Sequence, residues 1–142
     1  EKSHLQKFVL LDWRQDFGNL THVGDIYYDL AKMYGGVNIS YQLIKEGMLS
    51  FDMSGSSVYY KYFIKKYLLE AKEQCEEFFK KEDYDIKKIK LITSLIFLNM
   101  SPLHNDPFDF MLYFMGKNML YKTLKEIESS NVILGAQKDV AF

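Results

Sequence analysis

The chain has 142 residues, 48% of them hydrophobic and 16% aromatic, with only 2 prolines and 8 glycines, which suits one packed domain and excludes a disordered or collagen-like chain. The 18 basic and 19 acidic side chains nearly cancel, so charge alone indicates neither a nucleic-acid partner nor an anionic membrane. A single cysteine, Cys75, excludes a disulfide framework and favours a reducing compartment.

The first part of the chain combines one predicted strand with two predicted helices. The apolar run at residues 8–11 has the length and composition of a short buried strand. From Asp25 onward the apolar residues recur with a helical period, and Asp25 itself is suited to cap this helix. The glycine pair at 35–36 is expected to end it. A short helix over residues 40–48 and a loop over residues 50–57 follow.

Three longer helices are predicted for the remainder. An amphipathic stripe predicts a helix over residues 58–81. A second helix over residues 86–100 becomes apolar on nearly all sides, which is typical of a buried central helix. Asp106 and Pro107 suit the N-cap and first position of a last helix that ends near Ile127.

These elements predict a mainly α fold with a short N-terminal β segment. Residues 1–128 are expected to form the single domain and residues 129–142 a loose tail. No apolar stretch approaches the roughly 20 residues that a membrane span needs. We therefore expect a cytoplasmic protein without a membrane or nucleic-acid partner.

Acidic residues stand out in residues 8–32, which read FVLLDWRQDFGNLTHVGDIYYDLAK. Asp12 ends the predicted strand, and Asp25 and Asp29 lie at the start of the helix that follows. An acid at a strand end is commonly a turn residue. The same position can also aim a carboxylate into a cleft, where it holds a metal ion. The residues alone leave both interpretations open.

The order of these residues resembles the aminoglycoside phosphotransferase and choline kinase family, whose enzymes have a protein-kinase-like fold. The matching segments are Leu10-Leu11-Asp12-Trp13 and Gly24-Asp25-Ile26-Tyr27-Tyr28-Asp29-Leu30-Ala31. In that family both segments belong to the helical C-terminal lobe. The resemblance therefore implies that residues 1–128 are the helical C-lobe of a protein-kinase-like fold.

The resemblance also implies a role for each acid. Asp12 matches the magnesium ligand, which corresponds in role to the aspartate of the protein-kinase Asp-Phe-Gly motif. Asp16 is the fallback ligand, because Asp16-Phe17-Gly18 spells that motif but lies beyond the end of the predicted strand. Asp25 and Asp29 match structural acids of the motif.

Arg14, His104 and Asp106 are the candidate substrate-binding residues. Arg14 resembles the arginine of an Asp-x-Arg motif in a bacterial subgroup associated with capsule and surface-polysaccharide synthesis. Its guanidinium could hold a phosphate or sugar hydroxyls, and an ion pair with a neighbouring acid is the alternative. His104 and Asp106 lie in a polar connection between long helices, where loop and helix-cap roles are the alternative.

The function that the resemblance implies is transfer of a phosphoryl group from ATP, with Mg²⁺, to a hydroxyl of a sugar or amino-alcohol. The nucleotide and this small molecule are the expected partners. The chain contains no match to the family's catalytic loop, which precedes the metal ligand, so we expect a C-terminal fragment that is inactive alone. The alternative function is a non-catalytic α-helical interaction module, in which Asp12 and Asp29 are structural acids.

Overall fold

The computed structural model describes the chain from residue 18 to residue 138. Within this range the fold is mainly helical with one two-stranded antiparallel sheet, which confirms the predicted mainly α class. The elements in chain order are α1 (Ile26–Val37), α2 (Tyr41–Lys45), β1 (Leu49–Ser54), β2 (Ser57–Tyr62), α3 (Lys66–Lys81), α4 (Ile86–Met100), a 3-10 turn (Ser101–Leu103) and α5 (Phe108–Lys138). The strand predicted at residues 8–11 lies outside the described residues.

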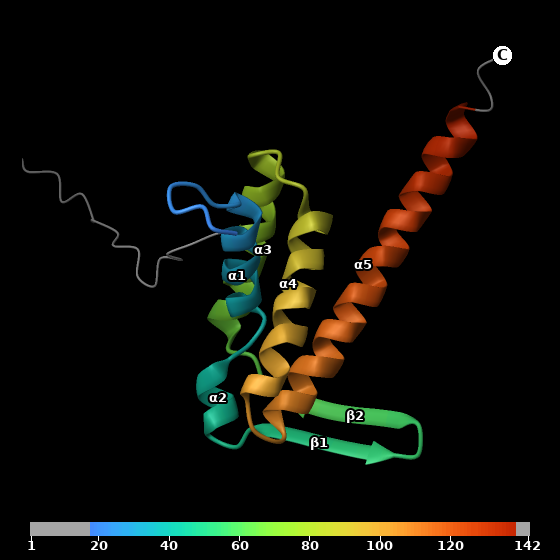
Figure 1. Cartoon of the computed structure of the whole chain (residues 1–142). Coiled ribbons are helices and arrows are strands. Elements are labelled where there is room, and N and C mark those ends of the chain that lie inside the picture. Colours follow the sequence, from blue (N-terminus) through green and yellow to red (C-terminus); the bar gives the residue numbers. More distant parts are fainter. Residues whose placement is uncertain (1–17, 139–142) are drawn as a thin grey trace, which may run out of the picture.

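Helix α4 stands at the centre of the fold and packs against α1, α3 and α5 (Figure 1). The Thr93 hydroxyl lies 3.0 Å from the carbonyl oxygen of Ala31 and 2.9 Å from that of Ile89, and so links α4 to α1. Leu95 on the remaining side is 48% exposed. The expectation that α4 is buried on all sides was therefore wrong, because the three neighbouring helices leave one face of it uncovered.

The apolar core is divided into two buried clusters along α4. The first joins α1, α3 and the start of α4, and its members are Leu30, Ala31, Tyr34, Phe79 and Ile89. The second lies toward the hairpin and joins the end of α4 to the start of α5, with members Ile39, Phe97, Met111, Leu112 and Met115. The partly buried side chains of Leu49, Tyr60 and Tyr62 pack against the second cluster, so the sheet covers one end of the helical body.

Helix α1 begins as predicted. The Asp25 carboxylate accepts a hydrogen bond from the Tyr27 N–H at 2.9 Å and so caps the helix. The helix does not end at the glycine pair but continues to Val37. Gly35 instead faces α4: a Cβ at this position would lie 3.3 Å from a ring carbon of Phe97. This glycine therefore serves the contact between the two helices.

The β-hairpin was not predicted. Its strands occupy residues for which the sequence indicated a loop and the first turn of a long helix, and α3 begins only at Lys66. In β2 the less exposed Val58, Tyr60 and Tyr62 alternate with exposed neighbours. This is the period of two expected for a strand, in β-branched and aromatic residues that favour one.

The end of the chain also differs from the prediction. Helix α5 starts at Phe108, after a cis bond between Asp106 and Pro107, so Pro107 is not its first residue. The carboxylate that accepts a hydrogen bond from an N–H of the first turn, that of Phe110, is Asp109 and not Asp106. The helix continues through Lys138, so most of the segment expected as a loose tail is helical. No helix in the described range is both long and apolar enough to cross a membrane.

Candidate functional site

The sequence-predicted site residues are only partly covered by the structure. The magnesium ligand Asp12, its fallback Asp16 and the substrate-binding candidate Arg14 all lie outside the described residues. The structure therefore shows the positions of the two structural acids, Asp25 and Asp29, and of the remaining two substrate-binding candidates.

The two structural acids lie at the start of α1. Asp25 is the N-cap, whereas the Asp29 side chain is exposed one turn later. Between them, Tyr27 holds this end of α1 against the connection from α3 to α4. Its hydroxyl accepts a hydrogen bond from the Asp85 N–H at 3.2 Å, and its ring lies edge-on to that of Tyr84 with centroids 6.0 Å apart.

The connection from α4 to α5 lies at the other end of α4 (Figure 1), and it contains His104 and Asp106. The start of α4 adjoins Tyr27 through Asp85, and 15 helical residues follow before the turn that leads to His104. At 1.5 Å per residue these residues separate the two ends by roughly 20 Å. The structure therefore does not bring His104 and Asp106 together with the acids of α1.

The surroundings of His104 are those of a structural loop residue. Its ring packs on Phe108 with centroids 4.7 Å apart. Its backbone N–H donates a hydrogen bond to the backbone carbonyl of Ser101 at 3.2 Å. Asp106 is exposed. These contacts agree with the loop interpretation that the sequence left open for this segment.

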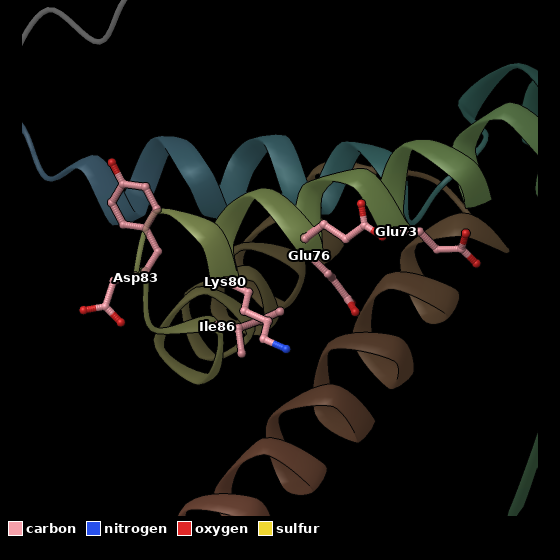
Figure 2. Close-up of a pocket in the computed structure, with 7 residues that line it drawn as sticks. Glu73, Glu76, Lys80, Asp83 and Ile86 are labelled. Carbon is pink, nitrogen blue, oxygen red and sulfur yellow. The ribbon is translucent and has the colours of Figure 1, made fainter.

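A pocket of about 580 Å³ lies beside α3 and its connection to α4. Figure 2 shows that α3 and the connection to α4 form its walls. The lining residues are Glu73, Glu76, Glu77, Lys80, Asp83, Tyr84 and Ile86. Through Tyr84 the pocket adjoins Tyr27, and hence the Gly24–Ala31 segment that carries the family resemblance.

One carboxylate of this pocket is bonded to the helical core. The hydroxyl of Tyr34, on α1, donates a hydrogen bond of 2.5 Å to Glu76 Oε1. Burial, foremost, and this bond to a carboxylate raise the pKa of Tyr34 above its ordinary value, so the phenol keeps its proton. Burial also raises the pKa of the neighbouring Cys75, which makes this thiol a poor nucleophile.

The charges of the pocket determine what it can attract. Four carboxylates and one ammonium group, that of Lys80, line it, so a cation or a molecule with several hydroxyls suits it better than an anion. Within residues 18–138 there is no group of three His, Cys, Asp or Glu side chains that could hold a metal ion.

Sequence reasoning did not find this pocket. The spacing of Glu73, Glu76 and Lys80 places them on one face of a helix, a pattern that usually marks a solvated surface. The pocket arises because Tyr84, from the connection after α3, and Ile86, the first residue of α4, lie beside that face. Only the tertiary arrangement contains this information.

Comparisons with known proteins do not assign this fold or site to a family. No protein-family model, no curated protein and no solved structure matches the chain. The resemblance to the aminoglycoside phosphotransferase and choline kinase family stays a prediction from its two short segments.

Proposed function

We propose that this chain is the C-terminal part of an ATP-dependent phosphotransferase that phosphorylates a hydroxyl of a sugar or amino-alcohol, in surface-polysaccharide biosynthesis. The observation that carries the proposal is the geometry of the Gly24–Ala31 segment. Asp25 caps a helix that packs on the central α4, and this supports the proposal because the resemblance assigns the segment to a helical C-lobe.

The division of roles in this proposal follows the motif. Mg²⁺ neutralises the phosphate charge of the nucleotide, and Asp12 is the residue that would hold it. Asp25 orders the start of α1 through its bond to Tyr27, which in turn contacts Tyr84 at the pocket. The pocket has the volume of a small-molecule site, and its acids favour an acceptor that carries an amino group or several hydroxyls.

The test uses the longest protein that the reading frame of this chain encodes. ADP release is measured with Mg²⁺ and ATP against a panel of sugars and amino-alcohols. Asp12→Asn removes the proposed magnesium ligand and should lower the turnover by about a hundredfold or more. Asp16→Asn makes the same chemical change at the fallback ligand four residues later. Turnover near that of the unmodified protein in this variant assigns the magnesium ion to Asp12 rather than to Asp16.

Two results would refute the proposal. The first is full activity in the Asp12→Asn variant, and the second is no ADP release with any acceptor in the unmodified protein. The reading frame itself separates the proposal from the alternative of a non-catalytic interaction module. A His-Gly-Asp-x-x-x-x-Asn segment upstream, preceded by a small lobe with a lysine-bearing strand, supports the phosphotransferase. An unrelated upstream sequence supports the module.

A further inference from the structure

The β-hairpin has a free strand edge whose geometry follows from its turn. Ser54 pairs with Ser57 across the two-residue loop Gly55-Ser56, and Gly55 supplies a φ of +58°. Residues that flank a two-residue loop form a hydrogen-bonded pair, and such pairs alternate along the ladder. The N–H and C=O groups of Ser57, Tyr59 and Lys61 therefore face β1.

The backbone groups of the alternate residues, Val58, Tyr60 and Tyr62, consequently point away from β1. Within the described part of the chain the sheet has only two strands, and no other backbone hydrogen bond reaches these three residues. Figure 1 shows the hairpin extending past the foot of α5, with its turn directed away from the helices. The outer edge of β2 is thus available for another strand.

This edge has few of the features that usually prevent strand addition. Strand β2 contains no proline, the hairpin pairing has no bulge, and Lys61 is the one charged residue of the strand. Valine and three tyrosines give β2 a high strand propensity. Strand β1 differs, because two serines and an aspartate reduce its strand propensity and because Phe51 stacks on Phe110 at the start of α5.

We propose that the β2 edge binds the β2 edge of a second copy of this chain, in antiparallel register with Tyr60 on a two-fold axis. This register pairs Val58 with Tyr62 of the partner subunit, and it satisfies every outward N–H and C=O of β2. The product is a four-stranded sheet in the order β1-β2-β2-β1. The inward side chains of Tyr60 and Tyr62 keep their packing on the helical body.

Side-chain chemistry supports a second copy as the occupant. The register places Lys61 opposite Tyr59 of the partner subunit on the outward face, twice across the axis. Tyr59 is 62% exposed, so its ring is available to an ammonium group. Lys61 already lies 5.4 Å from the ring centroid of its own Phe63, which shows that it reaches aromatic faces on this surface. No like charges are placed directly opposite each other.

The proposed contact predicts both the number of subunits and a weak association. A two-fold pairing uses the same edge on both copies, so it closes at a dimer. An interface limited to one strand per copy is small, so the dimer should form in a concentration-dependent equilibrium. The proposal is independent of the phosphotransferase function, because none of its residues belongs to the motif segments or to the acidic pocket.

Sedimentation velocity of the full chain over a range of concentrations tests the dimer. We expect a shift from monomer to dimer as the concentration rises. Tyr59→Lys places an ammonium group opposite Lys61 of the partner subunit at two positions and should weaken association about tenfold or more. Ser54→Lys adds the same charge to the same face of β1, away from the proposed contact, and should leave association unchanged.

A charge exchange makes the test specific. Adding Lys61→Glu to Tyr59→Lys restores an attractive pair across the axis, so the double variant should regain the dimer. Amide hydrogen exchange at Val58, Tyr60 and Tyr62 should slow as the concentration rises. Val58→Pro removes one outward N–H and should also weaken association. It provides a second disruptive variant in case the circular dichroism spectrum shows that Tyr59→Lys alters the fold. A monomer at every concentration, or a dimer that is unaffected by both Tyr59→Lys and Val58→Pro, would overturn the proposal.

Discussion

Gly116 on α5 faces the carbonyl oxygen of Ser94 on α4 so closely that a Cβ at Gly116 would stand 2.9 Å from that oxygen. The same atom would lie 3.1 Å from side-chain carbons of Phe97 and of Leu98. The Ser94 carbonyl is part of the α4 backbone, so it cannot move away from an added Cβ unless the helix itself shifts. The closest approach of the two helices therefore depends on the absence of a side chain at this position.

Gly116→Ala should lower the free energy of unfolding by about 1–3 kcal/mol, the usual cost of inserting a group into a packed contact. Urea unfolding followed by circular dichroism measures it. Gly36→Ala is the matched control, because Gly36 also lies inside a helix but has no atom within 4 Å of an added Cβ. This control should gain about 0.5–1 kcal/mol from helix propensity. Equal effects of the two variants would contradict the proposed contact.

The two structural acids of α1 should respond differently to substitution. Asp25→Ala removes the bond from the Tyr27 N–H and should cost about 1 kcal/mol of unfolding free energy. Asp29→Ala changes an exposed side chain and should stay within about 0.5 kcal/mol of the unmodified protein. Thermal and urea unfolding of both variants provide the comparison. A larger loss for Asp29→Ala would show that this acid has a partner that matters for stability.

The hairpin should depend on one aromatic stack. Phe51 lies 5.1 Å from the ring centroid of Phe110 and 5.9 Å from that of Phe114, in stacked geometry. Phe51→Ala should therefore lower the free energy of unfolding by about 2 kcal/mol and speed amide exchange in β1. Met53→Ala, two residues along the same strand at a side chain that is 55% exposed, is the control and should have little effect.

The helices could be predicted from the sequence because their signals are local. The apolar period after Asp25 and the favourable cap at that residue are both contained in a few neighbouring residues. The hairpin could not be predicted in this way. Only three residues separate the end of β2 from the apolar stripe of α3. The short alternation of Val58, Tyr60 and Tyr62 was therefore interpreted as the start of the longer helical pattern. The turn at Gly55 alone did not separate them.

The candidate site was less predictable than the fold. His104 and Asp106 have the residue types of a polar site, but α4 places them at the opposite end of the fold from Asp25. Their residue types carry no information about that distance. The acidic pocket shows the opposite case. Its α3 residues have the types and spacing of an ordinary surface, and they line a pocket only because the folded chain places Tyr84 beside them.

The burial of Tyr34 and its hydrogen bond to Glu76 should make the stability of the protein depend on pH in the alkaline range. An unfolded tyrosine has a pKa of 10.0, and burial together with the Glu76 carboxylate raises the pKa of Tyr34 above that value in the folded chain. At pH values below 10.0 both the folded and the unfolded chain keep the phenolic proton, so the full contribution of Tyr34 to stability is present. Above it the unfolded chain releases the proton while the folded chain keeps it, so stability must fall as the pH rises.

Tyr34→Phe removes this contribution to the pH dependence. Urea unfolding between about pH 9 and about pH 11 should show a decline in stability that is shallower than that of the unmodified protein by up to about 1.4 kcal/mol per pH unit. Some decline should remain, because burial also raises the pKa of Tyr41, Tyr60 and Tyr62. Glu76→Gln should fall between the two, since it removes the carboxylate but leaves Tyr34 buried. If Tyr34→Phe declined as steeply as the unmodified protein, Tyr34 would not be the phenol that keeps its proton.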